Sequence, residues 1–375
     1  MIDWLLLLEW VIKSVVIIGV LLTGFAYMTW TERRFAALIQ QRYGPNRAGP
    51  FGLLLPVADG VKLIMKEELI PAGADKVVFL LAPIITVVPA LIILGVVPWG
   101  PTVQIFGHPI ALDLADVNVG MLYVLAIASI AVYGVALAGW SSNNKYTLLG
   151  GLRSSAQMVS YELAMGLAVM GPLMMANSMS MNDIVDGQKG LWYIVLQPVA
   201  AIVFYISTLA EVNRAPFDMP EAEQELTGGY HTEYSGMKFA LFFMAEYIKM
   251  IAVSAIFATL FLGGWRGPFV DQVPWLGLGY FWAKTIFLLI LMVWIRSTLP
   301  RVRYDRLMAL GWKMMFPTAL ANVVVTAGFM LLQKSNPVVF MAALSIWNVI
   351  MLALIFSSKP GGTWRPSRAT AETRN

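Results

Sequence analysis

Long apolar runs alternate with short polar segments along almost the whole chain. Runs of about 20 residues are long enough to cross the roughly 30 Å hydrocarbon layer of a membrane as helices. A turn at Asn336-Pro337 separates the last two runs. The pattern predicts spans at 4–30, 77–99, 118–140, 158–177, 191–210, 238–263, 277–297, 314–333 and 338–357.

The composition supports this interpretation. The chain has 375 residues, of which 58% are hydrophobic and 13% charged, and its mean hydropathy is +0.70. These values are typical of an all-α integral membrane protein, here one polytopic domain over 1–375. Residues 1–9 lack the basic leader of a cleavable signal.

Several classes of redox and metal site are excluded or disfavoured. The absence of Cys excludes iron–sulfur clusters and zinc held by thiolates of this chain. The two His residues are far apart in sequence, which argues against a haem or metal site. No glycine pattern follows a strand and opens a helix, so no nucleotide site is expected. Any redox carrier should therefore sit on a partner chain.

The distribution of Lys and Arg predicts the orientation. Most of these residues fall in the segments that follow the odd-numbered spans, whereas residues 100–117 contain none. The positive-inside rule therefore places the N-terminus outside and the basic tail, 358–375, in the cytoplasm. We interpret residues 100–117 as a surface hairpin or short helix on the outside of the cytoplasmic membrane.

A polar, acidic loop follows the fifth span, at 211–237. Pro and Glu after Asp218 predict the first turn of a short helix, and Gly228-Gly229 would end it. A solvated loop is the alternative interpretation. The acids of the loop are Glu211, Asp218, Glu221, Glu223, Glu225 and Glu233.

Segment 31–76 predicts an interfacial amphipathic helix that begins near Pro56. Val57 and Val61 lie on its apolar face, and the helix is too short to span a membrane. A plain membrane anchor is one interpretation. The other is a crevice for an amphipathic head group, because Asp59 and the Arg33-Arg34 pair bring opposite charges to an apolar surface.

Four carboxylates are expected at or within the membrane. Glu32, Glu162 and Glu211 stand at the cytoplasmic ends of spans one, four and five, and Glu246 lies about two turns into span six. Such groups are costly in a membrane and indicate function. Together they predict a proton path. The alternatives are interfacial anchors and, for Glu246, a structural ion pair with Lys249 on the same helix face.

Four long motifs carry a family resemblance. They read TERRFAALIQQRYGPNRAGPFGLLLPVADGVKLIMKE, GGLRSSAQMVSYELAMG, STLAEVNRAPFDMPEAEQELTGGYHTEYSGMKFALFFMAEY and RSTLPRVRYDRLMALGWK. The chain resembles the H-type membrane subunits of respiratory complex I, the NADH:quinone oxidoreductase. The resemblance covers almost the whole chain.

The resemblance implies a helical bundle below the peripheral arm that forms part of the quinone tunnel and begins the path coupling quinone reduction to proton translocation. It implies partner subunits of both arms, quinone as substrate, a lipid bilayer, no nucleic acid, no metal, and FMN and iron–sulfur clusters on partner subunits. The coupling residues would be Glu32, Glu162, Glu211, Asp218, Glu221, Glu223 and Glu246. The tunnel residues would be Arg33, Arg47, Asp59, Arg153 and Arg301.

Two positions depart from the family pattern: Leu55 stands where Gln is common, and His231 where Asn is common. Two other functions remain possible at this point. One is the homologous subunit of a related hydrogenase, a formate hydrogenlyase or another donor dehydrogenase, although the motif around Arg33 and Arg47 favours a quinone enzyme. The other is a stand-alone ion or solute transporter, which would predict inverted halves with broken helices.

Overall fold

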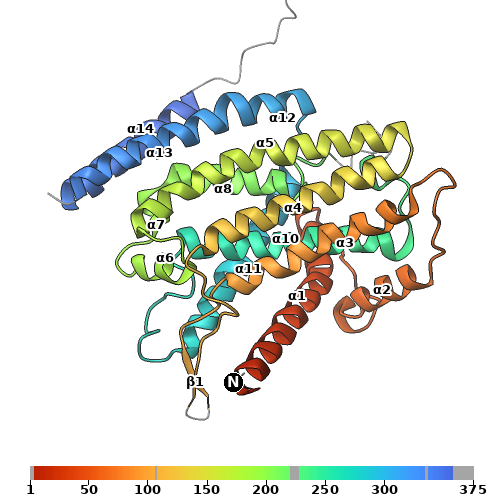
Figure 1. Cartoon of the computed structure of the whole chain (residues 1–375), viewed down its shortest axis with the longest axis horizontal. Coiled ribbons are helices and arrows are strands. Elements are labelled where there is room, and N and C mark those ends of the chain that lie inside the picture. Colours follow the sequence, from red (N-terminus) through yellow and green to blue (C-terminus); the bar gives the residue numbers. More distant parts are fainter. Residues whose placement is uncertain (1–3, 106–107, 220–227, 334–336, 358–375) are drawn as a thin grey trace, which may run out of the picture.

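The computed structural model describes residues 4–105, 108–219, 228–333 and 337–357, which form a helical bundle (Figure 1). The helices are α1 (Trp4–Ile39), α2 (Leu55–Met65), α3 (Lys76–Ile93), α4 (Gly120–Ser141), α5 (Lys145–Ala176), α6 (Met181–Gly187), α7 (Tyr193–Leu196), α8 (Pro198–Glu211), α10 (Gly236–Phe261), α11 (Trp275–Thr298), α12 (Tyr304–Leu310), α13 (Phe316–Gln333) and α14 (Pro337–Ser357). Short 3-10 turns lie at Pro50–Gly52, Leu94–Val96 and Gly229–His231.

The predicted spans correspond to helices of the bundle. Seven helical stretches of the described residues are long and apolar enough to cross a membrane, and two shorter apolar ones, Pro198–Glu211 and Val339–Leu354, account for the fifth and ninth spans. The prediction of an all-α membrane protein is therefore confirmed. The boundaries differ most at α1, which continues to Ile39, and at α5, which begins at Lys145.

The fifth span is not one continuous helix, so that part of the prediction is wrong. The chain breaks at Gln197, between α7 and α8, where the backbone has φ −131° and ψ 51°. Pro198 disfavours helical geometry in the residue before it and lacks an amide proton. Asn348 of α14 partly compensates, because its side chain donates to Leu196 O at 3.0 Å and accepts from Val199 N at 3.3 Å.

The eighth span begins earlier than predicted. Helix α12 continues into α13 through a π-helical turn, Gly311–Met315. Tyr161 of α5 packs against this turn, where its ring is 3.4 Å from the position that a Cβ on Gly311 would occupy. The Tyr161 hydroxyl donates to Leu307 O at 2.9 Å. The turn is therefore held against α5, next to Glu162.

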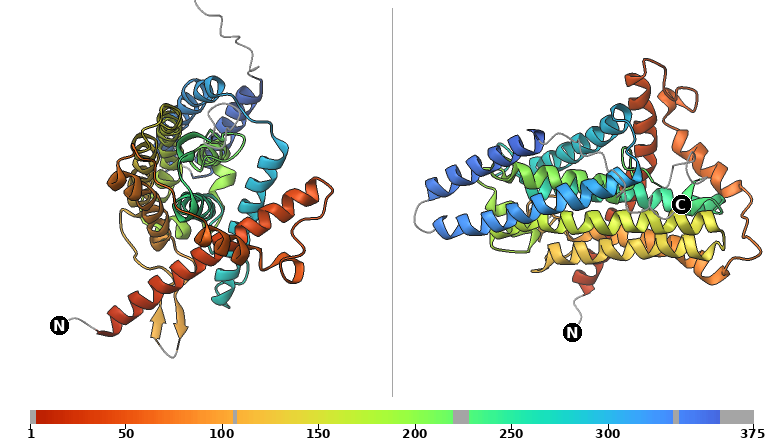
Figure 2. Two further views of the ribbon diagram at one scale, coloured as in Figure 1. Left: turned by 90° about the vertical axis from the view of Figure 1, so that its right-hand side faces the viewer. Right: turned by 90° about the horizontal axis from the view of Figure 1, so that it is seen from above.

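Helices α3, α4, α5, α8 and α10 form the packed centre, as their mutual contacts show. Helix α1 crosses this centre obliquely and packs against α10 and α11, while α13 and α14 lie side by side along one edge (Figures 1 and 2). Strands β1 (Val103–Ile105) and β2 (His108–Ile110) form an antiparallel hairpin. The hairpin lies at the same end as the N-terminus (Figures 1 and 2).

Helix α2 and the residues after it are attached to the start of α10. Pro56 stands in the first turn of α2, as predicted. The apolar residues of α2 remain exposed in this chain, with Val57 at 62% and Ile64 at 64%. Ser235 Oγ donates to Glu67 O at 3.2 Å, and Lys238 Nζ lies 3.1 Å from Glu68 Oε2. The interfacial segment and the loop after α8 are therefore joined directly.

Candidate functional site

Arg214, in the loop after α8, lies between two of the predicted carboxylates. Its NH1 is 3.2 Å from Glu32 Oε1 of α1, and its Nε is 2.6 Å from Glu246 Oε1 of α10. The side chain of Arg214 is 3% exposed and that of Glu32 is 10% exposed. Ion pairs buried in this way depend strongly on each partner, because an unpaired buried charge is costly. Arg214 therefore joins helices that are far apart in sequence.

Two further side chains complete the surroundings of Glu32. The Tyr247 hydroxyl donates to Glu32 Oε2 at 2.6 Å, and the Tyr247 ring lies 4.3 Å from the guanidinium carbon of Arg214. Arg296 of α11 forms an ion pair with Glu32 Oε1. Glu32 thus accepts contacts from α10, α11 and the loop, and losing its charge would affect all three.

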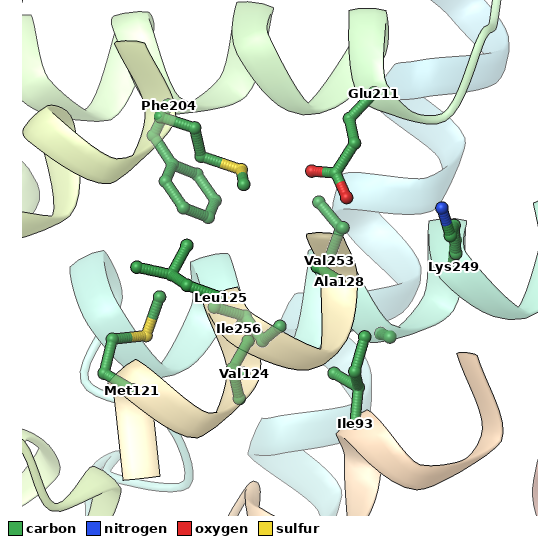
Figure 3. Close-up of a pocket in the computed structure, with 12 residues that line it drawn as sticks. Ile93, Met121, Val124, Leu125, Ala128, Phe204, Glu211, Lys249, Val253 and Ile256 are labelled. Atoms are coloured by element: carbon green, nitrogen blue, oxygen red, sulfur yellow. The ribbon is translucent and has the colours of Figure 1, made fainter. Parts of the chain in front are cut away.

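Glu211 and Lys249 line a second part of the site, a small cavity between α8, α10 and α4 (Figure 3). Its volume is about 20 Å³, enough for one water molecule. The other lining residues are apolar, including Phe204 and Ile256. Glu211 Oε2 is buried without a hydrogen-bond partner among the described residues. A carboxylate oxygen in this position can bind a water or a proton.

Glu162 of α5 belongs to the same part of the site. Lys249 is within electrostatic range of Glu162, Glu211 and Glu246. Ser129 Oγ of α4 forms a hydrogen bond with Glu162 Oε1. The four carboxylates predicted from the sequence therefore occupy one region. Arg214 pairs with Glu32 and Glu246 in one half of it, and Lys249 lies near Glu211 and Glu162 in the other. Glu246 forms an ion pair with Arg214 of the loop, and Lys249 of its own helix also lies within its electrostatic range.

The acidic loop is described only in part. Asp218 is half-buried, next to the buried Met219. Gly228 and Gly229 have φ values of 98° and 63°, a left-handed backbone that glycine adopts readily. The predicted helix between these points, with Glu221, Glu223 and Glu225, lies outside the described residues.

The predicted tunnel residues are distributed over three places. Arg33 NH1 is 3.0 Å from Asp59 Oδ2, so this pair ties the end of α1 to α2 as the crevice interpretation requires. Arg301 NH2 lies 3.8 Å from Met219 Sδ of the loop. Arg47 is exposed on the turn before α2, and the Arg153 guanidinium lies 5.2 Å from the Tyr304 ring. The structure brings Arg33 and Asp59 together, while Arg153 contacts Tyr304 and Arg301 contacts Met219.

Sequence reasoning missed three members of the site: Arg214, Tyr247 and Arg296. Arg214 and Arg296 appeared only as basic residues near the membrane surface, and Tyr247 as one residue of an apolar span. A usable signal existed, because a carboxylate at membrane depth requires a partner and Arg214 is the only Lys or Arg of the acidic loop, 211–237. Which carboxylate it reaches depends on the packing of α1 against α10.

His231 is placed as a neutral aromatic residue rather than as a ligand. Its ring contacts Tyr230, Phe239 and Phe243 at centroid distances of 5.1, 5.5 and 6.2 Å. Burial lowers the pKa of His231 to about 4. Over the described residues no group of three or more His, Cys, Asp or Glu side chains is arranged to hold a metal ion.

Comparison with known proteins gives one consistent family. The profile of the NADH dehydrogenase family matches residues 12–327. The chain is 51% identical over 319 residues to the second NADH-quinone oxidoreductase H subunit of Syntrophobacter fumaroxidans, covering 85% of this chain and 95% of that protein.

Two other relatives extend the comparison. The first NADH-quinone oxidoreductase H subunit of Geobacter sulfurreducens is 54% identical over 332 residues, covering 85% of this chain and 94% of that protein. The NADH-quinone oxidoreductase H subunit of Streptomyces avermitilis is 45% identical over 357 residues, covering 92% of this chain and 79% of that protein. The chain with the buried carboxylate cluster around Arg214 therefore belongs to the NADH dehydrogenase family of membrane proteins.

Proposed function

We propose that this protein is the membrane subunit of a proton-pumping NADH:quinone oxidoreductase, where it forms part of the quinone tunnel and couples quinone reduction to proton translocation. Three sets of observations support this: the names of its relatives, the apolar helices of the described residues, and the carboxylates gathered around Arg214 and Lys249. The observation that carries the coupling role is Arg214, held between Glu32 and Glu246 in the loop that leads to Asp218.

The quinone would enter between the end of α1 and α2. Here α2 carries the exposed apolar side chains Val57, Val61 and Ile64 on one face, while Asp59 pairs with Arg33 on the other. Such a surface suits a molecule with a long apolar tail and a polar head. The proposal also assigns tunnel roles to Arg47, Arg153 and Arg301. Of these, Arg301 contacts Met219 of the acidic loop.

Coupling would follow from charge. Reduction of a quinone to a quinol takes up two electrons, supplied by partner subunits, and two protons. A change of charge near the loop alters how strongly neighbouring carboxylates hold protons. When Glu32 or Glu246 takes a proton, its ion pair with Arg214 loses the attraction that held the loop. Arg214 then shifts toward the carboxylate that remains ionised.

The second half of the site would receive the proton. Glu211 and Lys249 line the small cavity, where one water could connect them (Figure 3), and Glu162 lies within electrostatic range of Lys249. Asp218, Glu221 and Glu223 would pass the effect of quinone reduction from the loop to this cavity. The chemistry of this chain is therefore proton binding and release, while nicotinamide oxidation, FMN and iron–sulfur clusters would belong to partner subunits.

Both alternative functions have weaker support. The curated relatives reported above are all named as H subunits of NADH-quinone oxidoreductase, which favours NADH over another electron donor. One broken helix occurs at α7–α8, as in many transporters, but its polar groups are the neutral Gln197 and Asn348 rather than ion ligands.

We place the N-terminus and the hairpin outside, and the tail, 358–375, in the cytoplasm. Labelling of an Asp113→Cys variant only from the cytoplasmic side would contradict this orientation.

The deciding experiment measures quinone-dependent NADH oxidation together with proton translocation in sealed vesicles that contain the whole complex. Glu211→Gln and Glu246→Gln keep the shape of each side chain but cannot exchange a proton, so both variants should assemble and lose most coupled turnover. Glu9→Gln is the matched control, since Glu9 pairs with Lys13 in the first turns of α1 at 2.7 Å. A wild-type rate and pumping ratio in Glu246→Gln would leave the coupling role without support.

A further inference from the structure

Gln157 of α5 is a fully buried amide that no function described so far requires. It is 0% exposed. Its Nε2 donates to Ala210 O at 2.8 Å and to Phe217 O at 2.8 Å, and lies 3.4 Å from Asn213 Oδ1. One side chain thus reaches both ends of the turn that carries Arg214.

The two carbonyl groups stand at critical places in this turn. Ala210 directly precedes Glu211, and Phe217 directly precedes Asp218. Between them the backbone follows a tight path, with Asn213 at φ 56° and a hydrogen bond from Phe217 N to Arg214 O at 2.9 Å. The Gln157 amide therefore closes the turn from the side of α5, and its two N–H groups bond to carbonyl groups that also accept from Asn213 N and Met219 N.

We propose that Gln157 is a positioning residue, which holds the turn 210–217 against α5 so that Arg214 stays between Glu32 and Glu246. The inference rests on the proposed coupling function but adds a specific mechanical connection to it. Helix α5 carries both Gln157 and Glu162, five residues later. A movement of the turn is therefore transmitted to the helix that bears a carboxylate of the second half of the site.

The geometry provides a way to distinguish a hydrogen-bonding role of Gln157 from a role in packing alone. Two carbonyl oxygens face position 157, and only a donor there can bond the turn to α5 through them. Gln157→Met keeps an unbranched side chain of similar length but provides no donor. Gln157→Glu provides one donor when the carboxyl is protonated and none when it is ionised. The glutamate variant should therefore recover part of the wild-type behaviour as the pH is lowered, whereas the methionine variant should not.

The first readout is the opening of the turn, measured without turnover. Since the chain contains no Cys, a single Val212→Cys substitution places one thiol in the turn, at a position that is 1% exposed. The maleimide labelling rate of this thiol in the intact complex reports local opening. Loss of two buried hydrogen bonds should raise that rate about tenfold in Gln157→Met. Ser142→Cys, at a 3% exposed position after α4, corrects for the effect of pH on thiol reactivity.

The second readout is the number of protons translocated per quinone reduced, between pH 6 and pH 8. The ratio should fall in Gln157→Met at every pH, and in Gln157→Glu mainly at the higher pH. Gln197→Met is the matched control, because Gln197 is also a 0% exposed amide with side-chain hydrogen bonds, to Thr326 and Asn322. This control should leave the Val212→Cys labelling rate unchanged.

Two results would overturn the inference: an unchanged labelling rate in Gln157→Met, or identical behaviour of Gln157→Met and Gln157→Glu at every pH. Failure of the coupling function has a different signature. In that case Glu246→Gln would retain normal pumping, while substitutions of Gln157 would still change the labelling rate of Val212→Cys. That outcome would support the positioning role of Gln157 without the coupling function.

Discussion

Two of the buried polar networks among the described residues differ in what they can do. One surrounds the α7–α8 break and contains Gln197, Asn322, Thr326 and Asn348, which are neutral and at most 1% exposed. The other joins Glu32, Arg214 and Glu246 and extends to the cavity of Glu211 and Lys249. The first has one protonation state at any physiological pH. The second contains carboxylates that can gain or lose a proton, and so can change its ion pairs.

This difference separates a structural role from a functional one. In the neutral network, Asn348 replaces backbone hydrogen bonds lost at Pro198, and the Gln197 side chain bonds to Thr326 and Asn322. In the charged network, Arg214 contacts carboxylates from two helices. A cation shared by two acids has two available arrangements once either acid is protonated, which is the requirement for a switch. The following predictions test this distinction.

The largest effect is expected from removing the shared cation. Arg214→Met leaves Glu32 and Glu246 buried without it, and breaking a buried pair typically costs about 3–5 kcal/mol. We expect much less assembled complex and at least a tenfold loss of coupled turnover, measured by yield and vesicle assays. The double variant Arg214→Met, Glu246→Gln should recover part of the assembly. Normal assembly and thermal stability in the single variant would contradict the distinction drawn between the charged and the neutral network.

The second effect concerns a titratable group of the same loop that lies outside the ion-pair network. The folded protein holds the pKa of His231 at about 4, below the ordinary 6.5, because burial disfavours its charged form. The unfolded chain therefore binds more protons between these values, so stability is complete above pH 6.5 and falls as the pH drops toward 4. The change is at most about 3 kcal/mol, at ~1.4 kcal/mol per pKa unit.

His231→Phe should flatten this dependence, as thermal unfolding of the complex between pH 4 and pH 7 would show. The pH profile of coupled turnover between pH 6 and pH 8 should stay unchanged, because His231 is neutral over that range in the folded protein. A changed turnover profile would mean that His231 takes part in the charged network.

The third effect is expected in the neutral network. Asn348→Leu removes hydrogen bonds to Leu196 O and Val199 N and leaves buried backbone groups without partners. This should cost about 1–3 kcal/mol of stability. The number of protons translocated per quinone should remain that of the wild type. Ser345→Ala, on the exposed side of α14, is the control for stability. A reduced pumping ratio in Asn348→Leu would remove the distinction between the two networks.

The smallest effect on stability is expected at the tunnel entrance. The Arg33 and Asp59 side chains are 52% and 25% exposed, and pairs of this kind contribute about 0–1 kcal/mol. Asp59→Ala combined with Arg33→Ala should therefore assemble, but should raise the Michaelis constant for short-chain quinone. NADH oxidation by an artificial acceptor at the flavin should be unaffected, and Lys66→Ala, at an exposed position directly after α2, serves as a control. A parallel loss of both activities would indicate faulty assembly instead.

Much of the fold could be predicted because its signal is local. An apolar run of span length predicts a helix wherever it stands, and Pro56 marks the start of α2 through its own backbone geometry. The break at Gln197 was missed although Pro198 was visible, because a proline within an apolar run can either kink a helix or begin one. The choice depended on Asn348, which is 151 residues away along the chain and supplies the compensating hydrogen bonds.

The candidate site divides in the same way. Glu32, Glu162, Glu211 and Glu246 could be singled out from the sequence, because an ionisable residue in an apolar span is conspicuous wherever it occurs. Their partners could not. Arg214 meets Glu32 across 182 residues, and Tyr247 meets it across 215. Gln157, one polar residue within a long motif, gained its role only through the carbonyl groups of Ala210 and Phe217.

The sequence by itself determined that this protein lies in a membrane, roughly where its helices run, and which acids stand within or at the ends of its apolar segments, because burial in lipid restricts each segment independently of the others. The tertiary structure alone decided how those acids are paired. Ion pairs and hydrogen bonds act over a few ångströms, so their partners are set by the packing of α1, α5, α10 and the loop after α8, and no local pattern contains that information.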